Sequence, residues 1–281
     1  MLLMVLINYA KFLNNIKFRK ILYGSFEAGD KTSTKIWDLT NFSILQDWTN
    51  GANEIINFAN ADKISQMTNK KLNTILRQAK GADKTASVSN NFAKNIKILA
   101  DLISTNRCKD ILEGRIFKNI SNNLSEIDNV FISPLEPIFE KLKIPLLNFK
   151  EDENIVNAFS AVNWCINNNL VQQGFTILQE TITTFVCIKE SLDYTKEINR
   201  EIVNSCFKIA RDSLQEYDWK GAANNKDLAK KILKNDIIKA LANDFSTLTN
   251  LKNDIIMQVL KKQELKIQRN LKQNLKTFIV M

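Results

Sequence analysis

Glycine and proline are scarce in this chain, and this scarcity most constrains its fold. The 281 residues include only 7 Gly and 3 Pro. A β-sandwich or β-barrel needs turn signals roughly every 8–12 residues, so the sequence favours long helices instead. With 44% hydrophobic and 25% charged residues, the composition is that of a globular chain, long enough for one or two domains with a sizeable core.

Apolar spacing predicts helices along most of the chain. Residues 1–14 are predicted to form a buried helix, because the apolar run is too short to span a membrane and lacks the basic start and cleavage site of a signal peptide. From about residue 42 onward only helix patterns occur. One apolar stripe joins Phe92, Ile96, Leu99 and Ile103. A second stripe is predicted to lie on one helix face and contains Trp164, Val171, Phe175, Leu178, Ile182 and Phe185.

Strand signals are confined to the N-terminal part. Residues 17–24 alternate and end at a glycine, which predicts a strand, while residues 36–39 fit either a second strand or the lead-in to a helix. Tyr23 and Gly24 end the first strand, where open α/β sheets place ligands. They are therefore candidate ligand neighbours as well as strand-terminating residues. The segment 128–145 contains all three prolines and is predicted to be a connector.

The chain contains no histidine. This absence removes the most common general base, the Ser-His and Cys-His nucleophile pairs, and imidazole metal ligation. The four cysteines are scattered without a CxxC pair, so we predict reduced thiols, no zinc site and no cofactor. A chain of this kind without a secretory signal is expected in the cytoplasm.

A formal charge of +9 is consistent with a polyanionic partner, although an A+T-rich genome would also enrich lysine. Residues 251–281 hold seven basic and two acidic residues, and they are predicted to form a further long helix or pair of helices. The basic stretch 261–276 is either a solvated amphipathic face, with Leu271, Leu275 and Phe278 buried, or a surface that follows RNA phosphates.

Three segments in this order resemble the CARF–HEPN proteins of type III CRISPR systems. Residues 21–28, 37–40 and 45–50 resemble the second half of a CARF domain, a Rossmann-like sensor, with residues 45–50 at a helix start. The helical pattern from Trp164 through Gln172 and Gln173 to Glu180 is similar to one in this family. These three polar residues are otherwise read as contacts at a helix interface. Residues 251–257, Leu-Lys-Asn-Asp-Ile-Ile-Met, are similar to the HEPN ribonuclease motif.

The resemblance implies a mainly α fold, a helical HEPN-like bundle preceded by the C-terminal part of an α/β Rossmann-like CARF domain. It divides the chain into a partial CARF domain over 1–62, a helical connector over 63–149 and a HEPN-like helical domain over 150–281. It also implies a homodimer, RNA as a partner, a cyclic oligoadenylate activator and no membrane. The family's first strands and loops have no counterpart here. We therefore expect a truncated sensor, a strand without its native neighbours and at most residual activator binding.

The motif that would carry catalysis is degenerate. In the family, an Arg and a His four to six residues apart act on RNA; the resemblance places Lys252 and Met257 at these positions and Asn253 at the polar one. Methionine cannot transfer a proton, and general acid–base catalysis is typically worth about 10²–10⁴-fold in rate. We therefore predict an impaired or inactive ribonuclease involved in antiviral defence. The alternative is a non-catalytic helical RNA-binding or interaction module that uses the basic C-terminal helices.

Overall fold

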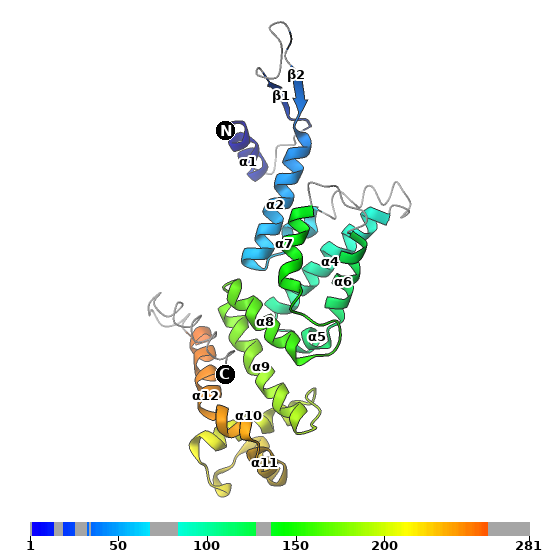
Figure 1. The fold of residues 1–281 in the computed structure, drawn as a ribbon. Coiled ribbons are helices and arrows are strands. Elements are labelled where there is room, and N and C mark those ends of the chain that lie inside the picture. The colour runs from blue at the N-terminus through cyan, green and yellow to red at the C-terminus, as the bar shows by residue number, and fades with distance from the viewer. Residues whose placement is uncertain are drawn as a thin grey trace. The chain divides into compact units, whose positions relative to one another are not determined.

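The structure is a computed structural model that describes residues 2–13, 19–25, 33, 35–67, 84–127 and 136–257. Helices dominate these residues, which confirms the mainly α prediction (Figure 1). None of the helices described is long and apolar enough to cross a membrane. Backbone contacts group the chain into two compact units, residues 1–50 and 51–281. The division into 1–62, 63–149 and 150–281 stays a prediction.

The first unit contains helix α1 (Leu2–Phe12), strands β1 (Leu22–Ser25) and β2 (Lys35–Asp38), and the start of α2 (Thr40–Phe58). The two strands pair antiparallel, with Tyr23 opposite Trp37. Of the two alternatives for residues 36–39, the structure therefore shows the strand, and β1 has a partner within the chain. The expectation that the strand lacks the neighbours it has in the family stays a prediction. Only residues 26–34 separate the strands, and this connection is too short for the crossover that a parallel pair needs.

The junction between β2 and α2 is built by a local cap. The Asp38 carboxylate accepts a hydrogen bond from the Thr40 backbone N–H at 2.9 Å, and the Thr40 hydroxyl oxygen accepts one from the Ile21 N–H at 3.1 Å. Hydrogen bonds from Thr40 lower the pKa of Asp38. Helix α2 therefore begins at Thr40. The sequence had suggested that residues 45–50 form the start of a helix, but they lie inside α2.

Helix α1 forms where the sequence predicts it but is not a buried helix. Ile7 is 2% exposed, whereas Tyr9 and Phe12 are 60% and 79% exposed. One face of α1 therefore packs, and Lys11 on it makes an ion pair of 2.7 Å with Asp47 of α2. The apolar run alone gives no sign of this one-sidedness, because it has no polar face.

The second unit begins with the end of α2 and continues through α4 (Lys84–Ser104), α5 (Cys108–Glu113) and α6 (Arg115–Ile127). The predicted stripe of α4 is buried in its contact with α5 and α6, which confirms it: Phe92, Ile96, Leu99 and Ile103 are at most 3% exposed. Gly114 separates α5 from α6 with a positive φ of 76°. A side chain there would clash with the backbone of Asp152.

The proline-bearing segment is only partly a connector. Residues 128–135 lie outside the described residues, but α7 (Glu136–Leu146) follows and contains Pro137 and Pro145. Proline is compatible with the first turn of a helix, where its missing N–H would have no partner. The proline signal therefore overestimated the length of the connector.

The second predicted stripe belongs to two helices rather than one. Helix α8 (Ile155–Asn167) ends at a turn in which Asn169 has a positive φ of 58°, and α9 (Val171–Lys189) follows. Trp164 and Phe175 are both buried, as predicted, but on separate helices that pack against each other. Asparagine is among the residues that tolerate this backbone conformation, so the break is a local effect of the residues 167–169.

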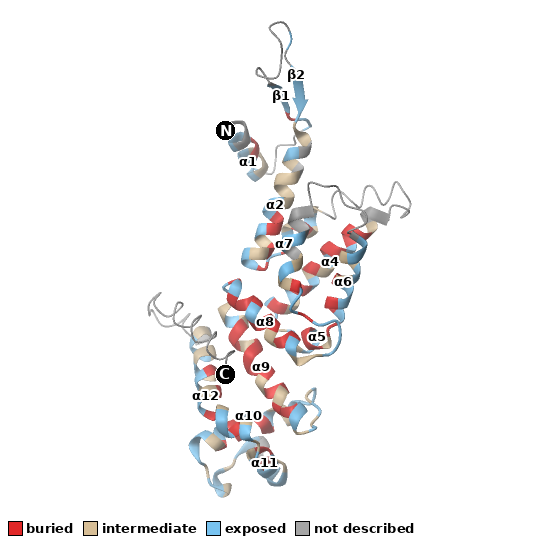
Figure 2. Ribbon diagram, viewed as in Figure 1, coloured by how far each residue is buried: buried red, intermediate tan, exposed pale blue. Residues whose placement is uncertain are grey.

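The rest of the unit consists of α10 (Glu197–Asp212), α11 (Lys226–Leu233) and α12 (Asp236–Met257), with short 3₁₀ turns between α10 and α11. Figure 2 shows the buried residues gathered along α8 and α9. The rings of Phe207 and Phe245 stack with centroids 4.1 Å apart and join α10 to α12. The basic stretch 261–276 and its three apolar residues lie outside the described residues.

Candidate functional site

The predicted catalytic positions lie at the C-terminal end of α12. Lys252 is partly buried and Asn253 is exposed, while the side chain of Met257, the last residue of α12, lies outside the described part. Their roles stay a prediction. Consecutive residues of a helix point about 100° apart around its axis. The side chains of Lys252 and Asn253 therefore face different directions, although the two residues are neighbours in the chain.

The predicted ligand neighbours Tyr23 and Gly24 lie on β1 and are exposed. They belong to the first compact unit, whereas Lys252 and Asn253 belong to the second. Their role as ligand neighbours also stays a prediction.

A polar pocket of about 510 Å³ lies among α5, α8, α9 and α10. This volume is within the range of small-molecule sites, about 300–1,000 Å³. Most of the residues that line it carry a hydroxyl or a charge; the lining is Asn106, Arg107, Cys108, Lys109, Asp110, Leu112, Ala158, Thr176, Glu180, Thr181, Thr184, Tyr194, Thr195 and Arg200.

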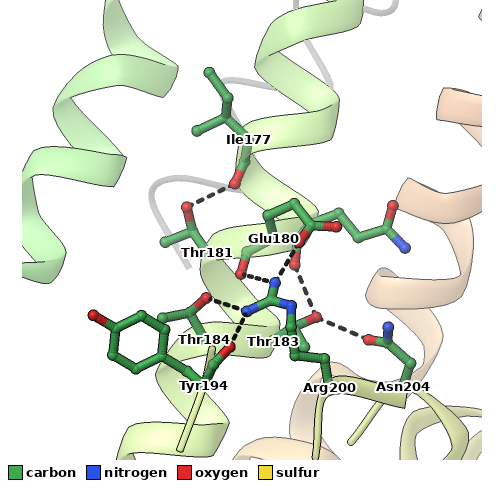
Figure 3. A network of polar contacts seen from close by, with 9 residues as sticks. Ile177, Glu180, Thr181, Thr183, Thr184, Tyr194, Arg200 and Asn204 are labelled. Carbon is green, nitrogen blue, oxygen red and sulfur yellow. Dashed lines mark hydrogen bonds and ion pairs between the residues drawn. The ribbon is translucent and has the colours of Figure 1, made fainter. Parts of the chain in front are cut away.

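Arg200 of α10 is the centre of the pocket's hydrogen bonds (Figure 3). Its Nη1 donates to the Thr184 hydroxyl at 2.9 Å and to the Tyr194 carbonyl at 3.2 Å. Its Nη2 donates to the Glu180 carbonyl at 3.3 Å and forms an ion pair with the Glu180 carboxylate. One guanidinium therefore ties α9, the loop after it and α10 together, which its planar fork of donors allows.

Threonines line the face of α9 beside Arg200. The Thr181 hydroxyl donates to the Ile177 carbonyl at 2.6 Å, and Thr183 donates to the Asn204 side chain of α10 at 2.8 Å. Hydroxyls that bond within the helix or to a neighbouring helix can be buried without cost from an unpaired donor. The sequence can therefore place polar groups in the interior of this unit.

Two ionisable groups of the pocket, Tyr194 and Cys108, have raised pKa values and are held protonated. Burial, together with the hydrogen bond to Glu153 at 2.6 Å, raises the pKa of Tyr194 to about 12. Burial, and next the charge of Glu180, raises the pKa of Cys108 to about 12. A thiol needs a lowered pKa to act as a nucleophile near neutral pH. The pocket is thus equipped to bind polar groups, and neither of these two groups is activated for catalysis.

Sequence reasoning missed Arg200 and interpreted Glu180 only as a polar contact at a helix interface, a role that its ion pair with Arg200 fits. Residue type carries a usable signal here. Arginine accounts for only 7 of the 39 basic residues, so in this lysine-rich chain each arginine is a candidate for a position where a planar fork of donors matters, although an exposed one such as Arg115 does not fill that role. No group of three or more acidic or cysteine side chains within the described ranges is arranged to hold a metal ion.

No model of a known protein family matches the chain, and no curated protein matches it. The function must therefore be argued from the residues and the geometry.

Proposed function

We propose that the chain is a catalytically impaired relative of the CARF–HEPN ribonucleases of CRISPR-associated antiviral defence, and that it binds RNA without cleaving it efficiently. The observation that carries the proposal is the motif on α12. Lys252 and Asn253 stand on a helix of an otherwise helical unit, and a methionine stands where the motif requires histidine.

The chemistry of RNA cleavage explains why this substitution matters. Attack by the 2′-hydroxyl needs a base to remove its proton, positive charge to stabilise the phosphorane, and an acid for the leaving 5′-oxygen. Lys252 supplies a charge, without the bidentate fork of an arginine. Asn253 can hydrogen-bond a phosphate oxygen. The Met257 thioether supplies neither base nor acid, and no histidine elsewhere in the chain replaces it.

The first unit is proposed to be part of a sensor domain. Support comes from the order of its elements, in which β1, with Tyr23 and Gly24 at its middle, precedes a capped junction at Asp38 and then α2. The proposal includes a homodimer and, at most, weak binding of a cyclic oligoadenylate through this unit.

Restoring the motif tests the proposal. The double variant Lys252→Arg with Met257→His should gain metal-independent cleavage of single-stranded RNA, because it regains both the fork and a proton-transfer group. The matched control is Lys252→Arg with Met257→Gln, which has the fork and no group that titrates near neutral pH. Cleavage products are measured on denaturing gels. A folded Arg/His variant that leaves RNA intact, as the Arg/Gln control should, contradicts this assignment of the motif.

A second candidate is a non-catalytic helical RNA-binding or interaction module, unrelated to oligoadenylate signalling. The observation that favours it is the surplus of basic residues over 251–281, seven against two acidic. It predicts steeply salt-dependent RNA binding that added cyclic oligoadenylate does not change. A change of RNA affinity on adding the oligoadenylate supports the first candidate against the second.

A further inference from the structure

A groove separate from the Arg200 pocket is lined in part by a buried glutamine whose amide oxygen has no hydrogen-bond partner among the described residues. It has a volume of about 230 Å³ and lies where α9, α10 and α12 pack together. Its lining consists of Gln179, Asn204, Phe207, Lys208, Arg211, Ala242, Phe245, Ser246, Thr249 and Asn250. Gln179 is 8% exposed, and its Oε1 accepts no hydrogen bond from the described residues.

The orientation of the Gln179 amide follows from its neighbour. The Thr249 hydroxyl donates its one hydrogen to the Phe245 carbonyl at 2.8 Å, so its oxygen is left as an acceptor. With that hydrogen on the Phe245 carbonyl, the Gln179 Nε2 donates to the Thr249 hydroxyl oxygen at 3.1 Å. The amide oxygen is then the atom left without a partner. A buried carbonyl in this state is unfavourable, and a donor that reaches it from the groove would remove that penalty.

The rim of the groove is basic. Its lining includes Lys208 and Arg211 and no acidic side chain. Arg211 is paired with Asp212 outside the lining and also donates to Ser246, whereas no ion pair involves Lys208 among the described residues. The floor is apolar, formed by Ala242 and the stacked rings of Phe207 and Phe245. A ligand that fits must offer a hydrogen-bond donor to the floor and an anion to the rim.

We propose that this groove binds a ribose unit next to a phosphate, as found in single-stranded RNA. A 2′-hydroxyl donates to Gln179 Oε1, and the adjoining phosphate lies against Lys208 and Arg211. This inference takes from the proposed function only that RNA is the partner. It adds a contact with RNA at residues that lie outside the motif at Lys252–Met257. Asn253 lies one turn beyond Thr249 on the same face of α12, so a strand leaving the groove can continue towards the motif.

The test compares RNA with DNA on the same protein preparation. A labelled 12-nucleotide RNA and its DNA counterpart are titrated with the full chain by fluorescence anisotropy. We expect RNA to bind about 2- to 10-fold more tightly, the range of one neutral hydrogen bond. Gln179→Met should bring this ratio close to one. The exposed Gln172→Met on the same helix is the matched control and should leave it unchanged.

Because the ratio comes from one preparation, it does not depend on the fraction of folded protein, so a destabilised Gln179→Met variant still gives an answer. Lys208→Gln tests the rim: the slope of log affinity against log salt should become shallower by about 0.7. The exposed Lys118→Gln on α6 should not change it. Equal affinity for RNA and DNA, or an unchanged ratio in Gln179→Met, overturns the proposal and indicates a groove that holds only water.

Free nucleotides distinguish the source of the ribose and phosphate. Direct binding of AMP and not of 2′-deoxy-AMP, with no binding of the RNA strand, supports the chemistry of the groove and overturns RNA as its ligand. RNA binding without any effect of Gln179→Met overturns the groove alone and leaves the proposed function standing. If the Lys252→Arg, Met257→His variant does not cleave RNA while Gln179→Met still lowers the RNA-to-DNA affinity ratio, the motif assignment is overturned. The groove then stands as an RNA site.

Discussion

At the residue scale, Arg200 connects the parts of the second unit by hydrogen bonds that most single residues cannot make. It contacts α9 at Thr184 and Glu180 and the following loop at Tyr194. Its side chain is 21% exposed and that of Glu180 is 39% exposed, so solvent screens the pair only partly. Removing the guanidinium leaves the Glu180 carboxylate and three further acceptors, the Thr184 hydroxyl and the carbonyls of Tyr194 and Glu180, without their donor.

Arg200→Ala should therefore lower the free energy of unfolding by about 2 kcal/mol, since hydrogen bonds to charged groups are worth more than neutral ones. Urea unfolding followed by circular dichroism measures this loss. The matched control is Arg115→Ala, whose side chain is 84% exposed beside Glu113 and should cost at most about 1 kcal/mol. Equal losses in the two variants would show that the Arg200 network does not stabilise the unit.

Sequence reasoning at this scale succeeded with apolar residues and failed with polar ones. The burial of Phe92, Leu99 and Phe175 follows from helical spacing, because one face of a helix must pack. Spacing cannot find Arg200 or Gln179, since their partners come from other helices and no local pattern encodes those contacts. The buried threonines of α9 were missed for the same reason.

At the element scale, helix identity was predictable and helix boundaries were not. The stripe from Trp164 to Phe185 continues in register across the break at residues 168–170, so periodicity alone joins α8 to α9. Similarly, the alternation over 17–24 indicates a strand but does not name its partner, which the short connection to β2 determines. Helix boundaries and strand pairing are determined by the turns, and each turn depends on only a few residues.

The turn at Gly114 gives a sharp test at this scale. A Cβ on Gly114 would lie 2.2 Å from the Asp152 carbonyl oxygen, whereas a Cβ on Gly221 meets nothing within 4 Å. Both residues have positive φ, 76° and 65°. Gly221→Ala should thus cost only the backbone strain of about 1–2 kcal/mol. Gly114→Ala should cost clearly more, because backbone must also move.

Urea midpoints of the two glycine variants, measured side by side, check this difference. The subtraction cancels the loss of glycine's flexibility in the unfolded chain, which both variants share. If the two variants unfold at the same urea concentration, the close approach of the α5–α6 turn to residue 152 is wrong.

At the scale of the whole molecule, the mainly helical character was predictable from scarce glycine and proline, and the structure confirms it. The Rossmann-like sensor, the homodimer and the partners stay proposals, because each depends on contacts outside the chain or on family resemblance. The missing histidine still sets the chemistry. Any RNA that binds near α12 meets charge and hydrogen bonds there, but no imidazole to move a proton.

The central claim is that this chain binds RNA without cleaving it efficiently. The most direct measurement is a titration of the full, unaltered chain with end-labelled single-stranded RNA, followed by a denaturing gel of the same samples. The account predicts binding that weakens as salt rises, with the RNA recovered at full length. Rapid metal-independent cleavage that Lys252→Ala abolishes, or no binding even at low salt, would contradict it.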